Sequence, residues 1–193
     1  MTSPVPGQLF DTCAIINLSY CTPIASAFRS RYEGSAGWVR ATQAELVRQR
    51  SRRPPHPQAG RASNWAAMWL GIPIEIVEED LLVATESVQR SIAAGCSDSA
   101  LDHLGEAASI ALLASAGKGR LISDDHAARA ECRKRGLRAS STVGVAAHLL
   151  TIAGSGVDPT MADTYLQTLR TRERMHAQLT SIDLLAGDLG AWL

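Results

Sequence analysis

The stretch RLISDDHAARAECRKRGLRA, residues 120–139, establishes the fold class that we expect for this chain. Its first four residues have an apolar centre and predict a short strand, which ends against Asp124 and Asp125. Residues 127–135 predict a helix that a glycine closes, and residues 137–139 predict a second short strand. A strand, a helix and a strand in this order place two parallel strands in one sheet, with the helix packed on its face.

The same alternation of strands and helices continues on both sides of this stretch. Local patterns predict strands at residues 8–10, 38–39 and 72–77, a turn at 97–102, and helices at 12–18, 24–32, 42–52, 64–70, 78–94, 105–116, 143–152 and 159–185. This order predicts an α/β fold, a three-layer sandwich of helices around a central parallel sheet, with a C-terminal helical extension. We expect residues 7–153 to form the sandwich domain and residues 154–193 to form the extension.

Composition agrees with a globular protein that builds a full hydrophobic core. Of the 193 residues, 46% are hydrophobic and 20% are charged, which excludes a disordered chain. No stretch approaches the roughly 18 uncharged apolar residues of a membrane span, and the N-terminus does not resemble a secretory signal. The four cysteines lack the close pairing of a zinc site. We therefore expect reduced thiols, no membrane contact and a cytoplasmic location.

Charge is uneven along the chain although its sum is zero. The 19 basic and 19 acidic residues cancel, so the whole molecule has no basic field for nucleic acid, yet 17 of the basic residues are arginine. Five of them and no acid lie in residues 48–61, around the sequence Pro-Pro-His-Pro. We expect a long loop there, which is either a phosphate-binding loop or solvated surface. The arginines expected to bind phosphate are Arg48, Arg50, Arg52 and Arg53.

Acidic residues stand where predicted strands end or helices begin. Asp11 follows the first strand, Glu45 and Glu106 lie in first turns of helices, and Asp124 and Asp125 follow a later strand. Carboxyl ends of parallel strands meet at one edge of a sheet, so these carboxylates are expected to converge. Converging carboxylates repel one another, and a hard divalent ion with oxygen ligands relieves that repulsion. The pattern therefore predicts a Mg²⁺ or Mn²⁺ site, with one or two ions.

Each acid taken alone has a simpler structural interpretation. Thr42 and Glu45 have the spacing of a capping box, and Asp124 or Asp125 suits the N-cap of the next helix. Asp102 and Glu106, four residues apart, suit a solvated helix face. The histidines near these acids, His103 and His126, are either proton shuttles or incidental surface residues. Trp65 and Trp69 have the spacing of a packing pair rather than of a base-stacking platform.

Four stretches in the same order carry a resemblance to a known family. They are LFDTCAII (9–16), TQAEL (42–46), LGEAASIALLA (104–114) and LISDDHAAR (121–129), and the later sequence STVG (141–144) is similar to the Gly-Thr-Leu-Gly element of some members. Their order and spacing resemble the PIN-domain ribonucleases, which include the toxins of VapBC-type toxin–antitoxin pairs, over residues 7–153. The resemblance implies a PIN-like sandwich fold and metal-dependent endoribonuclease activity.

The resemblance also implies roles for individual residues. Asp11, Glu45, Glu106 and Asp125 match the acids that hold Mg²⁺ or Mn²⁺ for hydrolysis of RNA phosphodiester bonds by water. In an alternative assignment, the neighbouring Asp124 is the metal ligand in place of Asp125. Asp102 is a weaker candidate for an outer metal ligand, and the hydroxyls of Thr12 and Ser123 are candidates to hold water or carboxylate.

The expected partners follow from the same resemblance. They are an RNA substrate, a small DNA-binding antitoxin protein and a second copy of the chain in a homodimer. Two alternatives remain open: a catalytically silent PIN-like scaffold that binds RNA or protein, and a nuclease directed at DNA.

Overall fold

A four-stranded parallel sheet forms the centre of the molecule, as expected from the sequence. The computed structural model describes residues 5–94, 103–172, 174–175 and 179–187. In this part of the chain the strands are β1 (Gln8–Phe10), β2 (Ala36–Gly37), β3 (Arg120–Ile122) and β4 (Arg138–Ser140), in the order β2-β1-β3-β4. Leu9 pairs with Leu121, which pairs with Ala139. All neighbours run parallel, so their carboxyl ends lie at one edge.

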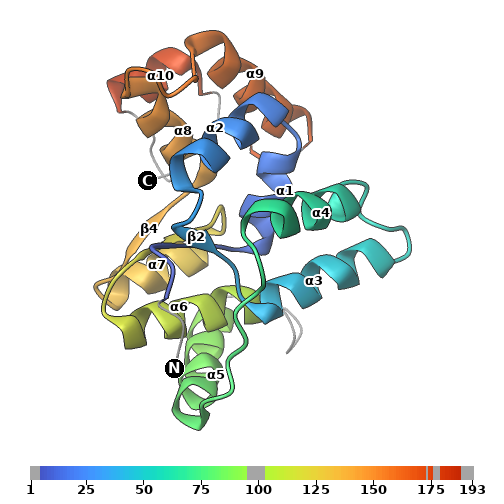
Figure 1. Cartoon of the computed structure of the whole chain (residues 1–193), viewed down its shortest axis with the longest axis vertical. Helices are drawn as coiled ribbons and strands as arrows, with labels where there is room; N and C mark the ends of the chain where they lie inside the picture. The colour runs from blue at the N-terminus through green and yellow to red at the C-terminus, as the bar shows by residue number, and fades with distance from the viewer. Residues whose placement is uncertain (1–4, 95–102, 173, 176–178, 188–193) are drawn as a thin grey trace.

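Helices connect the strands and cover both faces of the sheet. In chain order they are α1 (Thr12–Ser19), α2 (Thr22–Tyr32), α3 (Arg40–Ser51), α4 (Ala59–Trp69), α5 (Glu79–Ala93), α6 (Leu104–Ala116), α7 (His126–Lys134), α8 (Thr142–Thr151), α9 (Pro159–Thr171) and α10 (Ser181–Ala186). In Figure 1, α5 and α6 lie on one side of the sheet, and α2, α8, α9 and α10 lie on the other. None of the described helices combines the length and the apolar character needed to cross a membrane.

Neighbouring residues of each strand enter two different cores. Leu9 and Leu121 belong to a buried cluster with side chains of α5, α6 and α7. Phe10 and Ile122 belong to a second cluster with side chains of α1, α2, α4, α8 and α9. Successive side chains of a strand point to opposite faces, so strands buried on both sides are continuously apolar. The three-layer α/β sandwich is confirmed.

The C-terminal helices complete the second of these cores. Tyr165, Leu166 and Leu169 of α9 are fully buried against α8 and α2, and Leu184 of α10 is buried with them. The prediction of C-terminal helices is confirmed, but one continuous helix over residues 159–185 is wrong. The chain leaves α9 after Thr171, and a capping box at Thr180 starts α10.

Three other local expectations are wrong. The strand expected at 38–39 lies two residues earlier, as β2. Residues 72–77 form no strand. The segment makes a single parallel bridge, between Ile74 and Val39, and Val39 lies beyond the end of β2. Ile72 is 89% exposed, although an apolar side chain is expected to be buried. A loop as long as residues 48–61 is also wrong, because α3 continues through Ser51, close to the end of the helix expected at 42–52, and α4 begins at Ala59. The first helix-breaking proline in this region stands only at position 54. The turn expected at 97–102 lies outside the described residues.

Candidate metal centre

Two neighbouring strands deliver acidic residues to the same edge of the sheet. Asp11 follows β1 and Asp124 follows β3, and these strands pair in parallel. Asp11 is fully buried and caps α1, where its Oδ1 accepts a hydrogen bond of 2.7 Å from the amide of Ala14. The thiol of Cys13 donates to the same carboxylate at 3.1 Å. Asp11 is therefore held rigidly although its charge lies inside the protein.

Burial dominates the electrostatics of Asp11. It raises the pKa of this carboxyl from 3.8 to about 7, against the lowering effect of hydrogen bonds from Ser123, the Ala14 amide and Cys13. The negative charge of Asp124 raises the pKa further. Desolvation therefore outweighs these hydrogen bonds and favours the protonated form of Asp11.

Glu106 is the second buried acid and the least satisfied one. It lies in the first turn of α6 and is 6% exposed. Burial raises its pKa well above the ordinary range, and the charges of Asp11, Glu45 and Asp125 add to the shift. Among the described residues, its buried Oε2 has no hydrogen-bond partner. Buried polar atoms are nearly always paired, so this oxygen points to a missing partner.

Glu45 approaches the site from α3. Its Oε2 accepts a hydrogen bond of 2.7 Å from the hydroxyl of Thr12, and its Oε1 accepts one of 3.3 Å from Gln49. The capping-box interpretation of Glu45 is wrong, because α3 starts at Arg40 and its N-cap is Val39. The Thr12 hydroxyl therefore holds a carboxylate, which is one of the two roles expected for it.

A glycine lets α6 come close to α3 at this point. A Cβ atom on Gly105 would lie 2.9 Å from Thr42 Oγ1, 3.3 Å from Thr42 Cα and 3.4 Å from Glu45 Oε2. The lack of a side chain at Gly105 therefore permits Glu45 and Glu106 to approach each other from two helices.

The two consecutive aspartates point to different partners. Asp125 caps α7, with its Oδ1 accepting from the Ala128 amide at 2.8 Å, and its Oδ2 lies 3.9 Å from His103 Nδ1. Asp124 accepts three hydrogen bonds of 2.7 Å, two from Thr142 and one from Asn17. The N-cap interpretation therefore holds for Asp125, yet its second oxygen still faces the acidic cluster.

His103, expected from the sequence to be a proton shuttle or a surface residue and not a ligand, joins this cluster. His103, Glu106 and Asp125 each offer a ligand atom, and these atoms lie within 4.8 Å of one another. His103 has a left-handed backbone with φ 63°, which is uncommon for a residue with a side chain and is typical of functional sites. The available signal was its spacing, three residues before Glu106. Asp102, the expected outer ligand, lies outside the described residues.

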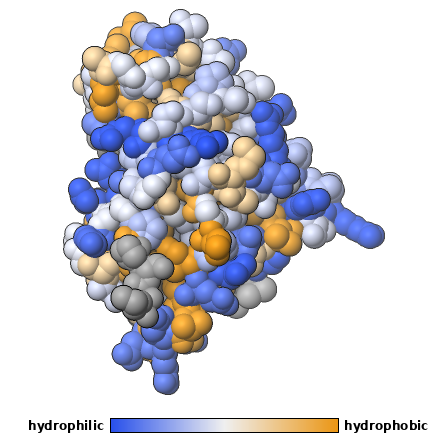
Figure 2. Space-filling model, viewed as in Figure 1, coloured by the Kyte–Doolittle hydropathy of each residue, from blue (hydrophilic) through white to orange (hydrophobic). Residues whose placement is uncertain are grey.

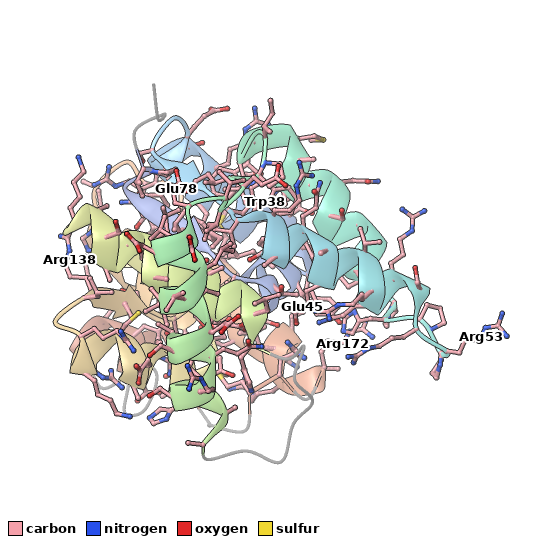
Figure 3. The ribbon with its side chains drawn as sticks, turned by 90° about the horizontal axis from the view of Figure 1, so that it is seen from below. Trp38, Glu45, Arg53, Glu78, Arg138 and Arg172 are labelled. Atoms are coloured by element: carbon pink, nitrogen blue, oxygen red, sulfur yellow. The ribbon has the colours of Figure 1, made fainter. Side chains whose placement is uncertain are left out.

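The expected phosphate-binding arginines lie on an arm made by the end of α3, the start of α4 and the link between them. Arg50, Arg52 and Arg53 are exposed, whereas Arg48 is half-buried. Figure 2 shows hydrophilic surface at the tip of this arm. In Figure 3, Arg53 extends outward at the tip while Glu45 lies further in along α3. The arm thus joins the acidic cluster to a basic tip.

The remaining candidates have structural roles or face solvent. Trp65 and Trp69 are in contact with ring centroids 5.1 Å apart and ring planes tilted by 54°, and Trp69 packs edge-on against Phe10 at 5.2 Å. The packing-pair interpretation is therefore confirmed. His126 is exposed at the start of α7.

The donor set fits a divalent cation. It combines several carboxylate oxygens with one imidazole, and such sets bind Mg²⁺, Mn²⁺ and related ions. The oxygen of Glu106 without a partner and the raised pKa values are the features that a bound cation would remove. No protein-family model, curated protein or solved structure matches this chain.

Proposed function

We propose that this chain is a divalent-metal-dependent endoribonuclease whose centre consists of Asp11, Glu45, Glu106 and Asp125, with His103 as a further ligand. The observation that carries the proposal is the Oε2 atom of Glu106, which is buried without a hydrogen-bond partner among the described residues. The carboxylate of Glu106 also offers a ligand atom within 4.8 Å of those of His103 and Asp125. A carboxylate of this kind is costly to bury in its charged form, and a bound cation would offset that cost.

The protein contributes fixed positions for the ligand oxygens. The Ala14 amide holds Asp11, the Thr12 hydroxyl holds Glu45, and capping of α7 holds Asp125. Asp125 Oδ2 remains turned towards His103, whereas three donors occupy Asp124. This contrast favours Asp125 as the ligand and Asp124 as the support. When bound, a Mg²⁺ or Mn²⁺ ion supplies activation of water and stabilisation of charge on the phosphate.

The arm supplies the contact with the substrate backbone. Ser51 ends α3 about 9 Å along the helix axis from Glu45, at 1.5 Å per residue. The exposed Arg50, Arg52 and Arg53 therefore lie within reach of phosphates adjoining one that occupies the acidic cluster. Guanidinium groups bind phosphate without reading bases. The choice of RNA rests on the resemblance to PIN-domain ribonucleases.

A cleavage assay tests the proposal. The purified chain is incubated with end-labelled single-stranded RNA in Mn²⁺, in Mg²⁺ and in EDTA, beside single-stranded DNA of the same sequence. We expect cleavage of RNA that EDTA abolishes and that the Glu106→Gln variant lacks. Cleavage of DNA alone would support the DNA-directed alternative, and RNA binding without cleavage in either metal would support the silent scaffold.

The toxin role and the partners form a further part of the proposal. The resemblance extends to VapBC-type toxins, so we propose a small DNA-binding antitoxin as the inhibitor and a homodimer as the assembly. Co-expression with a small DNA-binding protein encoded beside this chain is expected to suppress the cleavage. Sedimentation is expected to give twice the 20.6 kDa mass of the chain.

A further inference from the structure

Asp124 is held by a set of hydrogen bonds that converge from distant parts of the chain. Its Oδ1 accepts from the Thr142 amide, and its Oδ2 accepts from the Thr142 hydroxyl and from Asn17 Nδ2, each at 2.7 Å. Thr142 begins α8 and Asn17 lies in α1. This carboxylate therefore connects the end of β3 to two helices, α1 and α8, that pack on the same face of the sheet.

Both side chains that hold Asp124 are themselves held by the C-terminal segment. The hydroxyl of Tyr165, on α9, donates to Thr142 Oγ1 at 2.6 Å. Arg174, just beyond α9, donates from Nε to Asn17 Oδ1 at 2.9 Å. The single hydroxyl proton of Thr142 is donated to Asp124, so Thr142 accepts the Tyr165 proton through a lone pair. We call these hydrogen bonds, from Tyr165 and Arg174 through Thr142 and Asn17 to Asp124, the relay.

The relay reaches the proposed ligands through the backbone. The amide of Asp124 donates to Cys13 Sγ at 3.3 Å, and that thiol donates to the Asp11 carboxylate. Asp125 is the next residue in the chain. Fixing Asp124 therefore fixes the turn between β3 and α7, which places Asp11 and Asp125 relative to each other.

We infer that the C-terminal segment is part of the metal centre, and that Tyr165 and Arg174 are positioning residues that act through Thr142, Asn17 and Asp124. The inference rests on the proposed function, because it assigns these residues to the same site. It also means that the proposed sandwich domain, residues 7–153, does not contain every residue that its centre requires. Removing a residue that hydrogen-bonds to a metal ligand, without contacting the metal itself, commonly lowers metal affinity or activity 10- to 100-fold.

Tyr165→Phe is the cleanest test. Tyr165 is fully buried, and phenylalanine keeps the ring in the core while removing the donor. We expect the dissociation constant for Mn²⁺, measured by calorimetry on the full chain without RNA, to rise about 10-fold. Arg174→Gln should act in the same direction. Arg170→Gln is the matched control, because Arg170 Nη1 donates to the Leu179 carbonyl at 2.7 Å and not towards Asp124.

A second pair of variants separates positioning from general destabilisation. Thr142→Ser keeps the relay hydroxyl and should keep the affinity of the parent for Mn²⁺, whereas Thr142→Val removes the hydroxyl and should lower it. Since Tyr165 cannot touch RNA from the core, Tyr165→Phe should lower kcat at limiting Mn²⁺, leave KM for RNA unchanged and recover at high Mn²⁺. Circular dichroism verifies that each variant is folded.

The outcomes separate the inference from the proposed function. Equal Mn²⁺ affinity in the parent and in folded Tyr165→Phe would overturn the inference and leave the proposed nuclease standing. If the parent chain binds Mn²⁺ but cuts no RNA, and the relay variants bind Mn²⁺ more weakly than the parent, the inference would be supported and the proposed nuclease overturned. A parent chain that binds no Mn²⁺ would overturn both.

Discussion

Burying the carboxyl group of Asp11 contributes a large part of the electrostatic cost of the site. Its pKa is 3.8 in the absence of burial and about 7 in the fold, so between these values the folded state holds a proton that the unfolded state has lost. Stability therefore falls as pH rises from about 4 to about 7, by about 4 kcal/mol for a shift of this size. Asp11→Asn keeps the N-cap and removes this loss.

The prediction for Asp11→Asn is a shallower dependence of stability on pH and a loss of cleavage. Urea unfolding in EDTA at pH 4 to 8 should show the variant more stable than the parent at the alkaline end and similar to it at the acid end. Glu106 still titrates in the variant, so some slope remains. Parallel curves for the two proteins, or full activity of the variant in Mn²⁺, would contradict the assignment of Asp11.

His103 is expected to affect the choice of metal. Imidazole suits transition metals, whereas Mg²⁺ prefers oxygen ligands. His103→Asn should therefore weaken binding of Mn²⁺ more than binding of Mg²⁺, which calorimetric titrations with the two ions measure. His126→Asn is the matched control, because His126 is exposed at the start of α7. A proportional loss for both ions would assign His103 a supporting role instead.

At the scale of elements, the contact between α3 and α6 depends on Gly105. Alanine favours a helix over glycine by up to about 1 kcal/mol, but its Cβ would stand 2.9 Å from Thr42 Oγ1. We expect the clash to outweigh the propensity and Gly105→Ala to lose about 1–3 kcal/mol, together with Mn²⁺ affinity, because Glu45 is displaced. Thr42→Ala should rescue part of both losses in urea unfolding and calorimetry. A Gly105→Ala variant more stable than the parent would contradict this account.

Asp125 caps α7 with one oxygen and turns the other towards His103 in the proposed metal centre. Asp125→Asn keeps an acceptor for the Ala128 amide, whereas Asp125→Ala removes the cap at a cost of about 1 kcal/mol. Both variants remove the carboxylate, so both should lose Mn²⁺-dependent stabilisation, but only the alanine variant should be less stable in EDTA. Thermal unfolding with and without Mn²⁺ separates the two roles. Retained Mn²⁺ stabilisation in both variants would return Asp125 to capping alone.

At the scale of the whole molecule, charge separates along the chain. Residues 46–74 hold five arginines and no acid, and residues 75–89 hold five acids and no base. If the arm binds RNA, replacing Arg50, Arg52 and Arg53 by alanine should reduce the salt slope of binding by about 2 units, at roughly 0.7 per phosphate contact. Stability should change by less than about 0.5 kcal/mol, because these side chains are exposed.

Filter binding at several salt concentrations checks the arm, with an inactive Glu106→Gln background to prevent cleavage. Alanine at the exposed Arg31, Arg40 and Arg90, which lie outside the arm, is the matched control. The cut-site pattern of the active arm variant should match that of the parent, since phosphate contacts carry no base information. An unchanged salt slope would return the arm to solvated surface.

Local patterns were enough to predict the fold class and the acids at the strand ends. The alternation of short apolar runs with helices favours a parallel sheet, and the residues just after β1 and β3 lie at its carboxyl edge. Asp11 and the pair Asp124–Asp125 could therefore be located from neighbouring residues alone. The helical character of the C-terminal extension followed from its own spacing in the same way, but its division into α9 and α10 did not.

The roles within the site depended on contacts between residues far apart in the chain. Asp124 and Asp125 are adjacent and chemically identical, and they differ because Asn17, 107 positions away, and Thr142, 18 positions away, bind one of them. His103 enters the centre through a left-handed backbone at the start of α6. Tyr165 of α9 and Arg174, just beyond it, reach Thr142 of α8 and Asn17 of α1 only in the folded chain. Hydrogen-bond partners of this kind are selected by three-dimensional packing, which the periodicity of a sequence does not encode.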